Sequence, residues 1–166
     1  MRPLPLRALP VALLSALGCG DDDPPPADFA GEYTLAITNG ASTCPLDTWT
    51  EGTSSTGVPL TIAQDGDSVT VTVGGAGAVG LGLLIGAATL EGTVDGDTMT
   101  LTRPGTRAFS AGSCAFTIDA RAAADLDGDA LTGEIVYRPN ANDSPDCAGL
   151  ASCKATQRFN GTRPPR

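Results

Sequence analysis

The sequence contains no histidine among its 166 residues. Histidine is the usual general base of serine and cysteine nucleophile pairs and the commonest metal ligand, so its absence excludes a histidine-activated nucleophile and an imidazole-ligated metal site. No glycine-rich phosphate motif follows a predicted strand and opens a helix. Strand alternation places Glu32, Glu91 and Glu134 on the outer face, which gives little support for paired catalytic carboxylates. We therefore expect no enzyme, no catalytic residues and no cofactor.

Basic residues are few, with ten lysines and arginines against nineteen acids. Two of the ten, Arg2 and Arg7, lie in an N-terminal segment that we expect to be removed. The mature chain would then carry eight bases against nineteen acids, a formal charge of −11. A negative charge of this size argues against nucleic acids and anionic membrane surfaces as partners.

The acidic run at 125–129 resembles the start of a calcium loop. An EF-hand needs glycine at its sixth position and glutamate at its twelfth. Here Ala130 stands at the sixth position and Glu134 at the tenth. Turn chemistry explains the run, so no metal site is predicted.

Long helical periodicities are also missing, whereas Asp-Gly-Asp occurs three times, at 65–67, 95–97 and 127–129. Alternating apolar and polar residues lie on both sides of each copy. Asp-Gly between such runs is a strong hairpin signal, because a tight mirror-image turn needs a positive φ that glycine adopts without strain. The sequence therefore predicts an all-β, antiparallel domain.

Alternation predicts eight strands, each with one apolar face. Their ranges are 29–38, 58–64, 67–73, 87–94, 97–103, 113–122, 129–138 and 153–162. Pairing the first strand with the last removes exposed edges and gives an eight-stranded up-and-down barrel. The three Asp-Gly turns and both chain ends then lie at one end, the base, and the long connections surround a mouth at the other.

The N-terminal segment has the order of an export signal. Residues 1–7 carry two positive charges, 8–17 form an apolar core too short to span a bilayer, and the segment ends Ala16-Leu17-Gly18-Cys19. This ending resembles the lipobox of bacterial lipoproteins, with Ala16 and Leu17 interchanged relative to the usual pattern. The alternative is an ordinary secretory peptide followed by a chance cysteine.

The resemblance implies a signal peptide at 1–18 and a lipid on Cys19. It also implies a location in the cell envelope, anchored to the (outer) membrane and either periplasmic or surface-exposed. Residues 19–28 are acidic and proline-rich, which predicts an extended tether. The barrel domain would occupy 29–163.

The segment Phe29-Ala-Gly31-Glu-Tyr33 resembles the Gly-x-Trp opening of lipocalins and their calycin relatives, with tyrosine in place of tryptophan. The resemblance implies a lipocalin-like barrel whose long first connection forms a lid over a ligand mouth. It also implies that a late arginine, Arg158 or Arg163, packs on Tyr33.

The uncharged stretch between Val73 and Leu90 is rich in glycine and leucine. Its glycines make a poor helix, so we expect a connection at the mouth with an extended apolar tip, and membrane insertion is the alternative. Its leucines would fold into the mouth, meet a partner or plug the top of the core.

These features favour a lipid-anchored barrel that holds a small apolar ligand in the barrel or at its mouth. The candidate ligand-binding residues are Tyr33, Leu35, Ile37, Trp49, Val71, Val73, Leu83, Ile85, Phe116 and Tyr137. Taken singly, the two tyrosines are favoured as core-packing residues, and Trp49 is favoured as the anchor of a satellite cluster in its loop. The alternative function is a structural or protein-binding surface lipoprotein with a solid core, including a protease-inhibitor type.

Four cysteines remain beside Cys19, namely Cys44, Cys114, Cys147 and Cys153. Outside the cytoplasm, an even number predicts two disulfides. Cys147–Cys153 would close a small ring and leave Cys44–Cys114 to pin a lid across the mouth. The rival pairing, Cys44–Cys153 with Cys114–Cys147, would join neighbouring strands.

Overall fold

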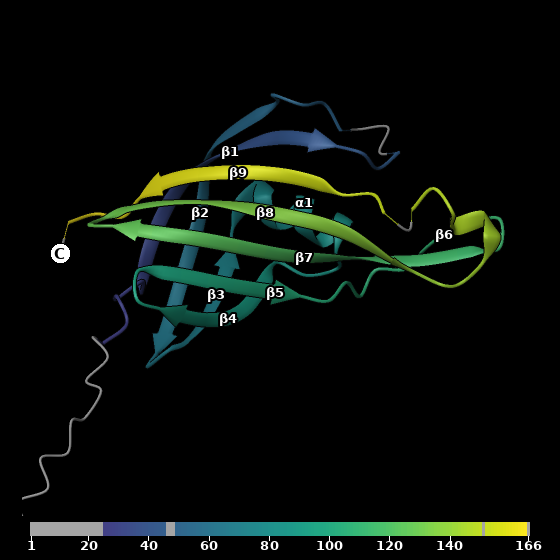
Figure 1. Cartoon of the computed structure of the whole chain (residues 1–166). Helices are drawn as coiled ribbons and strands as arrows, with labels where there is room; N and C mark the ends of the chain where they lie inside the picture. The colour runs from purple at the N-terminus through teal and green to yellow at the C-terminus, as the bar shows by residue number, and fades with distance from the viewer. Residues whose placement is uncertain (1–24, 46–48, 151, 166) are drawn as a thin grey trace, which may run out of the picture.

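A computed structural model describes residues 25–45, 49–150 and 152–165, and the predicted signal peptide, Cys19 and most of the tether lie outside these residues. The fold is all-β: eight antiparallel strands close into a barrel, and one short strand pairs outside it (Figure 1). The elements are β1 (Gly31–Ser42), β2 (Ser54–Asp65), β3 (Ser68–Val73), α1 (Gly75–Leu84), β4 (Thr89–Asp95), β5 (Thr98–Arg103), β6 (Phe109–Ala111), β7 (Cys114–Asp127), β8 (Ala130–Ala141), the 3-10 turn η1 (Pro145–Cys147) and β9 (Ala155–Thr162).

Closure follows the predicted scheme. Consecutive barrel strands pair in chain order, β1 pairs with β9, and β5 pairs with β7. The inward faces carry the apolar residues of the predicted alternation, and most of them are buried. The sequence-based prediction of an eight-stranded up-and-down barrel is therefore confirmed, with β6 as an addition.

The three Asp-Gly-Asp copies form the two-residue turns β2–β3, β4–β5 and β7–β8 at the base. Gly66, Gly96 and Gly128 have φ of 62°, 56° and 61°, and no other residue type has a positive φ in the described part of the chain. A positive φ at only the first central position is the type II′ arrangement, whose twist matches that of the flanking strands.

The base is closed by residues from both chain ends. Phe29 is fully buried, and its backbone N–H donates to Gln64 Oε1 at 2.7 Å. Arg163, just after β9, lies over the Tyr33 ring and donates to the backbone oxygens of Asp28 and Ala30. Of the two arginines that the lipocalin resemblance offered, Arg163 packs on Tyr33, whereas Arg158 lies exposed on the outside.

Strands β7 and β8 are longer than predicted. The sequence-based strand ended at 122, but β7 continues to Asp127 with Ala122 and Ala124 facing inward. Its other half passes the mouth together with β8 and forms an arm, against which β6 pairs (Figure 1). In a run of alanines, the inward and outward residues do not differ in polarity. The alternating pattern of apolar and polar residues therefore could not predict that the strand continues there.

The glycine-rich connection after β3 is a helix, so the predicted extended tip is wrong. Leu81 at the end of α1 and Ile85 just after it are buried, and their burial outweighs the low helix propensity of the glycines. Gly77 lets the helix approach β2 and β3 closely, because a Cβ there would lie 2.7 Å from Val58 Cγ1 and 2.8 Å from Val73 Cγ1. Among the described residues, no helix is long and apolar enough to span a membrane.

The disulfides are Cys44–Cys153 and Cys114–Cys147. The two predicted bonds are confirmed as a set, but the pairing that pinned a lid across the mouth is wrong. Each bond joins segments next to neighbouring strands at the mouth end: Cys44 follows β1 and Cys153 precedes β9, whereas Cys114 begins β7 and Cys147 lies in η1 after β8. The cysteines pair with those that the fold places beside them at adjacent strand ends, although a Cys147–Cys153 bond would have closed a shorter loop.

Candidate functional site

The barrel encloses a cavity of about 800 Å³ that opens toward the mouth. All eight barrel strands contribute to its wall. Apolar side chains make up most of the lining on the strands: Leu35, Ile37, Val58, Leu60, Val71, Val73, Leu90, Met99, Leu101, Phe116, Ile118, Ala122, Leu131, Ile135 and Phe159. The cavity is therefore a hollow within the barrel core, lined from residues next to the base turns, such as Met99 and Leu131, up to the mouth.

Small inward residues on one wall leave this space. Strand β7 places Ala120, Ala122 and Ala124 inward, where longer side chains would fill the interior of an eight-stranded barrel. Below the cavity, Phe29 and Tyr33 close the base.

Helix α1 borders the cavity at the mouth. It lies against β2 and β3 and turns Leu81, Leu83 and Leu84 toward the cavity. Leu83 and Val79 are nevertheless 57% and 64% exposed. The helix thus forms an apolar rim with one side open to solvent.

On the side of β1, β9 and β8, the wall is polar. The Tyr137 hydroxyl donates to Gln157 Oε1 at 2.7 Å, and Gln157 Nε2 donates to Asn39 Oδ1 at 2.8 Å. Asn39 Nδ2 in turn donates to the backbone oxygen of Thr50 at 3.2 Å. These three side chains form a connected hydrogen-bonded row, which we call the polar wall.

Trp49 lies beside the polar wall. Its ring meets that of Tyr137 edge-on, with centroids 6.1 Å apart, and its Nε1 donates to the backbone oxygen of Gly40 at 2.9 Å. Tyr137 is 2% exposed, and this burial raises the pKa of its hydroxyl well above the ordinary range. The wall is therefore polar but uncharged.

Eight of the ten candidate ligand-binding residues line the cavity. They are Leu35, Ile37, Trp49, Val71, Val73, Leu83, Phe116 and Tyr137. The other two lie elsewhere: Tyr33 closes the base, and Ile85 is fully buried beside the 104–108 connection, where its backbone oxygen accepts from Thr106 N. Ligand binding by the eight remains a prediction.

Sequence reasoning missed Asn39 and Gln157. Asn39 follows Tyr33, Leu35 and Ile37 at intervals of two, and Gln157 precedes Phe159 by two, so both have inward parity. The first predicted strand ended at 38, one residue before Asn39. Extending the alternation by one residue would have found it.

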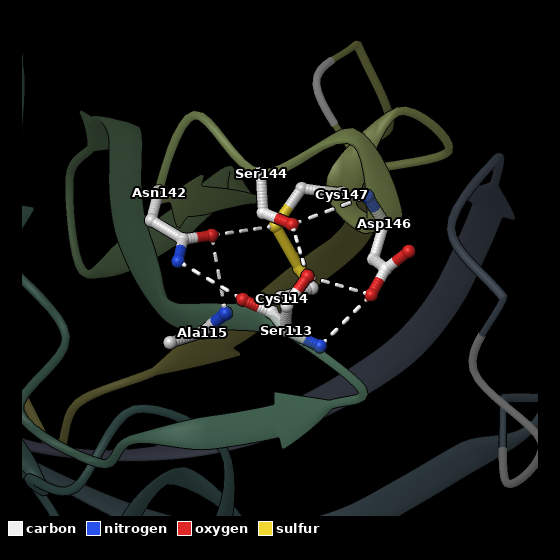
Figure 2. The surroundings of a disulfide bond; sticks show 7 residues. All are labelled: Ser113, Cys114, Ala115, Asn142, Ser144, Asp146 and Cys147. Carbon is white, nitrogen blue, oxygen red and sulfur yellow. Dashed lines mark hydrogen bonds between the residues drawn. A yellow bond between two sulfur atoms is a disulfide. The ribbon is translucent and has the colours of Figure 1, made fainter.

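A smaller hollow of about 280 Å³ lies between the two disulfides at the root of the arm, with Tyr137, Leu150 and Pro139 among its lining. Cys114 is among its lining residues, and Figure 2 shows the surroundings of the Cys114–Cys147 bond. There Ser113 donates to Asp146 Oδ2 from its hydroxyl at 2.7 Å and from its backbone N–H at 2.8 Å. These bonds hold the pKa of the exposed Asp146 carboxyl below its usual value and fix η1 against β7.

Within the described residues, no group of three or more His, Cys, Asp or Glu side chains could hold a metal ion. In the part of the chain that the structure describes, no Asp, Glu, Lys or Arg lines the large cavity. The arrangement is suited to holding a molecule by burial and neutral hydrogen bonds.

No protein-family model, curated protein or solved structure matches this chain. The function is therefore argued from the cavity and its surroundings.

Proposed function

We propose that the barrel binds a small, largely apolar molecule in its cavity. The observation that carries the proposal is the cavity itself, about 800 Å³ and lined mainly by apolar side chains. Ligand sites typically measure roughly 300–1,000 Å³ and are mostly apolar with a few placed polar groups. The closed base and the rimmed mouth leave the cavity accessible from one end.

Filling the cavity tests the proposal. Ala122 lines it, whereas Ala123, the next residue on β7, is exposed on the outside. We expect Ala122→Trp to weaken binding of the neutral fluorophore N-phenyl-1-naphthylamine at least tenfold and Ala123→Trp to leave it unchanged. Circular dichroism would verify that both variants fold. Equal binding by the two variants, or no binding by the wild type, would refute the proposal.

A second candidate function is protein binding through the mouth. The exposed side chains of Val79 and Leu83 on α1 favour it, since they place apolar surface at the rim. A charged substitution at Val79, which does not line the cavity, would abolish capture of a partner and leave fluorophore binding intact. We propose no catalytic role.

We also propose that the protein is exported and held on the membrane of the cell envelope by a lipid on Cys19. Two disulfides support an oxidising compartment. The chain enters the barrel at the base, so an anchored molecule would turn its mouth away from that membrane. Expressed in a bacterium, the wild type should partition into detergent, and Cys19→Ser should not; partitioning of both would contradict the anchor.

A further inference from the structure

We propose that the cavity selects a neutral amphiphile, with an alkyl tail and a hydroxyl or carbonyl head at the polar wall, over the corresponding carboxylate. The inference rests on the proposed function, because it specifies the ligand class for the same cavity. It is carried by two observations, the lack of charge among the described lining residues and the hydrogen-bonded row of Asn39, Gln157 and Tyr137 on one side of the cavity.

The first observation concerns charge. None of the described residues that line the cavity is charged, and the whole chain has a formal net charge of −9. A carboxylate that leaves water must find a cation or several hydrogen-bond donors, or take up a proton. The described lining residues supply no cation. An ionised head is therefore disfavoured in the cavity, whereas a neutral head on a chain of the same length is not.

The second observation concerns the polar wall. Asn39 and Gln157 stand opposite each other on β1 and β9, and Tyr137 reaches Gln157 from β8. The register places Gln157 two residues toward the mouth from Phe159, whereas apolar residues such as Leu131 and Phe159 lie nearer the base. A molecule with one polar end therefore fits with its tail toward the base.

The polar wall offers both donors and acceptors. An amide nitrogen carries two N–H groups, and an amide or hydroxyl oxygen accepts more than one bond. Within the row, Gln157 and Asn39 each donate once from their amide nitrogens. A hydroxyl or carbonyl head matches this mixed capacity. Burial keeps Tyr137 neutral, because it raises the pKa of the hydroxyl.

Two arginines near the mouth are the groups that could bind a carboxylate if the cavity held one instead. Arg103 ends β5 with the same parity as Met99 and Leu101, and its buried Nε has no hydrogen-bond partner among the described residues. Arg107 lies over Phe109, with its guanidinium carbon 5.5 Å from the ring centroid. Neither arginine lines the cavity. A carboxylate site would have to use one of them, which makes them useful test positions.

The experiment is displacement of bound N-phenyl-1-naphthylamine by 1-dodecanol and by dodecanoate at pH 8. We expect 1-dodecanol to bind at least tenfold more tightly. Lowering the pH to 4.5 should strengthen the competition by dodecanoate, which becomes protonated, and leave that of 1-dodecanol unchanged. Both compounds have the same chain length, so the comparison isolates the head.

Variants connect the preference to the polar wall. Gln157→Leu should weaken 1-dodecanol binding several-fold, and Asn160→Leu, an exposed amide on the same strand, should not. Equal or tighter binding of dodecanoate would overturn the inference while leaving the barrel a ligand binder, and loss of that binding in Arg103→Met or Arg107→Met would assign a carboxylate site. Failure of the fluorophore and of both compounds to bind would refute the proposed function itself.

Discussion

The guanidinium of Arg163 lies over the ring of Tyr33, 5.7 Å from its centroid, and Nη1 donates to the Tyr33 hydroxyl at 3.0 Å. Its Nε forms an ion pair with Asp129 Oδ1 at 2.9 Å, in the β7–β8 turn. One side chain therefore ties the start of β1, the end of β9 and a base turn together. The lipocalin resemblance anticipated such a contact from only a few residues.

Removing this side chain should destabilise the whole barrel. The Arg163 side chain is 9% exposed, so its bonds are largely protected from water, although Asp129 is 42% exposed. We expect Arg163→Ala to lower the free energy of unfolding by about 2 kcal/mol. Arg158→Ala is the control, since that side chain is 82% exposed and its pair with Glu134 is long, at 3.8 Å. Urea titration would measure both, and equal losses would contradict the role assigned to Arg163.

The turn glycines should resist substitution. Valine at Gly66, Gly96 or Gly128 would be strained, because a β-branched residue rarely adopts a positive φ. We expect each substitution to cost about 1–3 kcal/mol of unfolding free energy. Asp67→Val, in the same loop as Gly66 but at a negative φ, serves as the control and should cost much less. Thermal unfolding followed by circular dichroism decides between them.

Two glycines of α1 should respond differently to alanine. At Gly77 the added Cβ would meet Val58 and Val73, whereas nothing lies within 4 Å of a Cβ at Gly80. We expect Gly80→Ala to raise stability by about 0.5–1 kcal/mol through helix propensity. Gly77→Ala should lose that gain and shift the helix. If both variants were equally stabilised, the close contact of α1 with the barrel would be wrong.

The two disulfides should contribute unequally. Cys44–Cys153 closes 109 residues of sequence and Cys114–Cys147 closes 33. Loop-closure entropy then assigns about 5 and about 4 kcal/mol to them as upper values. Paired serine variants should lower the melting temperature more at 44 and 153, and peptide mapping without reduction should recover both linkages. A fragment linking Cys44 to Cys114 would contradict the observed pairing.

Alkaline pH should destabilise the fold through Tyr137. Burial raises its pKa in the folded state, so the unfolded chain releases this proton first. The contribution of the protonated Tyr137 to the free energy of unfolding is fully present below the tyrosine pKa of the unfolded chain, about 10. It is lost as the pH rises above that value. Unfolding free energies at pH 8 and pH 11 should therefore differ less in Tyr137→Phe than in the wild type. An identical difference in both would refute this assignment.

The sequence predicted the barrel because its signals are local. Each Asp-Gly turn fixes a register, and alternation then fixes which residues face inward. Helix α1 could not be predicted in this way, since it depends on burying Leu81 and Ile85 against strands distant in the chain. The cysteine pairing was wrong for a related reason. It was predicted from the shortness of the 147–153 loop, which carries no information on which strand ends are neighbours in the fold.

The candidate site was predicted in part. Parity identified apolar positions such as Leu35 and Val71, which line the cavity. It could not give the volume, which depends on how three inward alanines of β7 face the larger residues opposite. Asn39 was overlooked because the first predicted strand ended at 38, and Gln157, inside the last predicted strand, was overlooked because only apolar inward positions were chosen as candidates.

The closed base has a kinetic consequence for any molecule that occupies the cavity. Phe29, Tyr33 and Arg163 block one end, so arrival and departure share the route past α1. A change that obstructs this route without touching the bound molecule slows association and dissociation by the same factor and leaves the equilibrium constant unaltered. Obstruction at the rim would therefore change how fast such a molecule exchanges, whereas a change in the interior wall would alter the equilibrium constant.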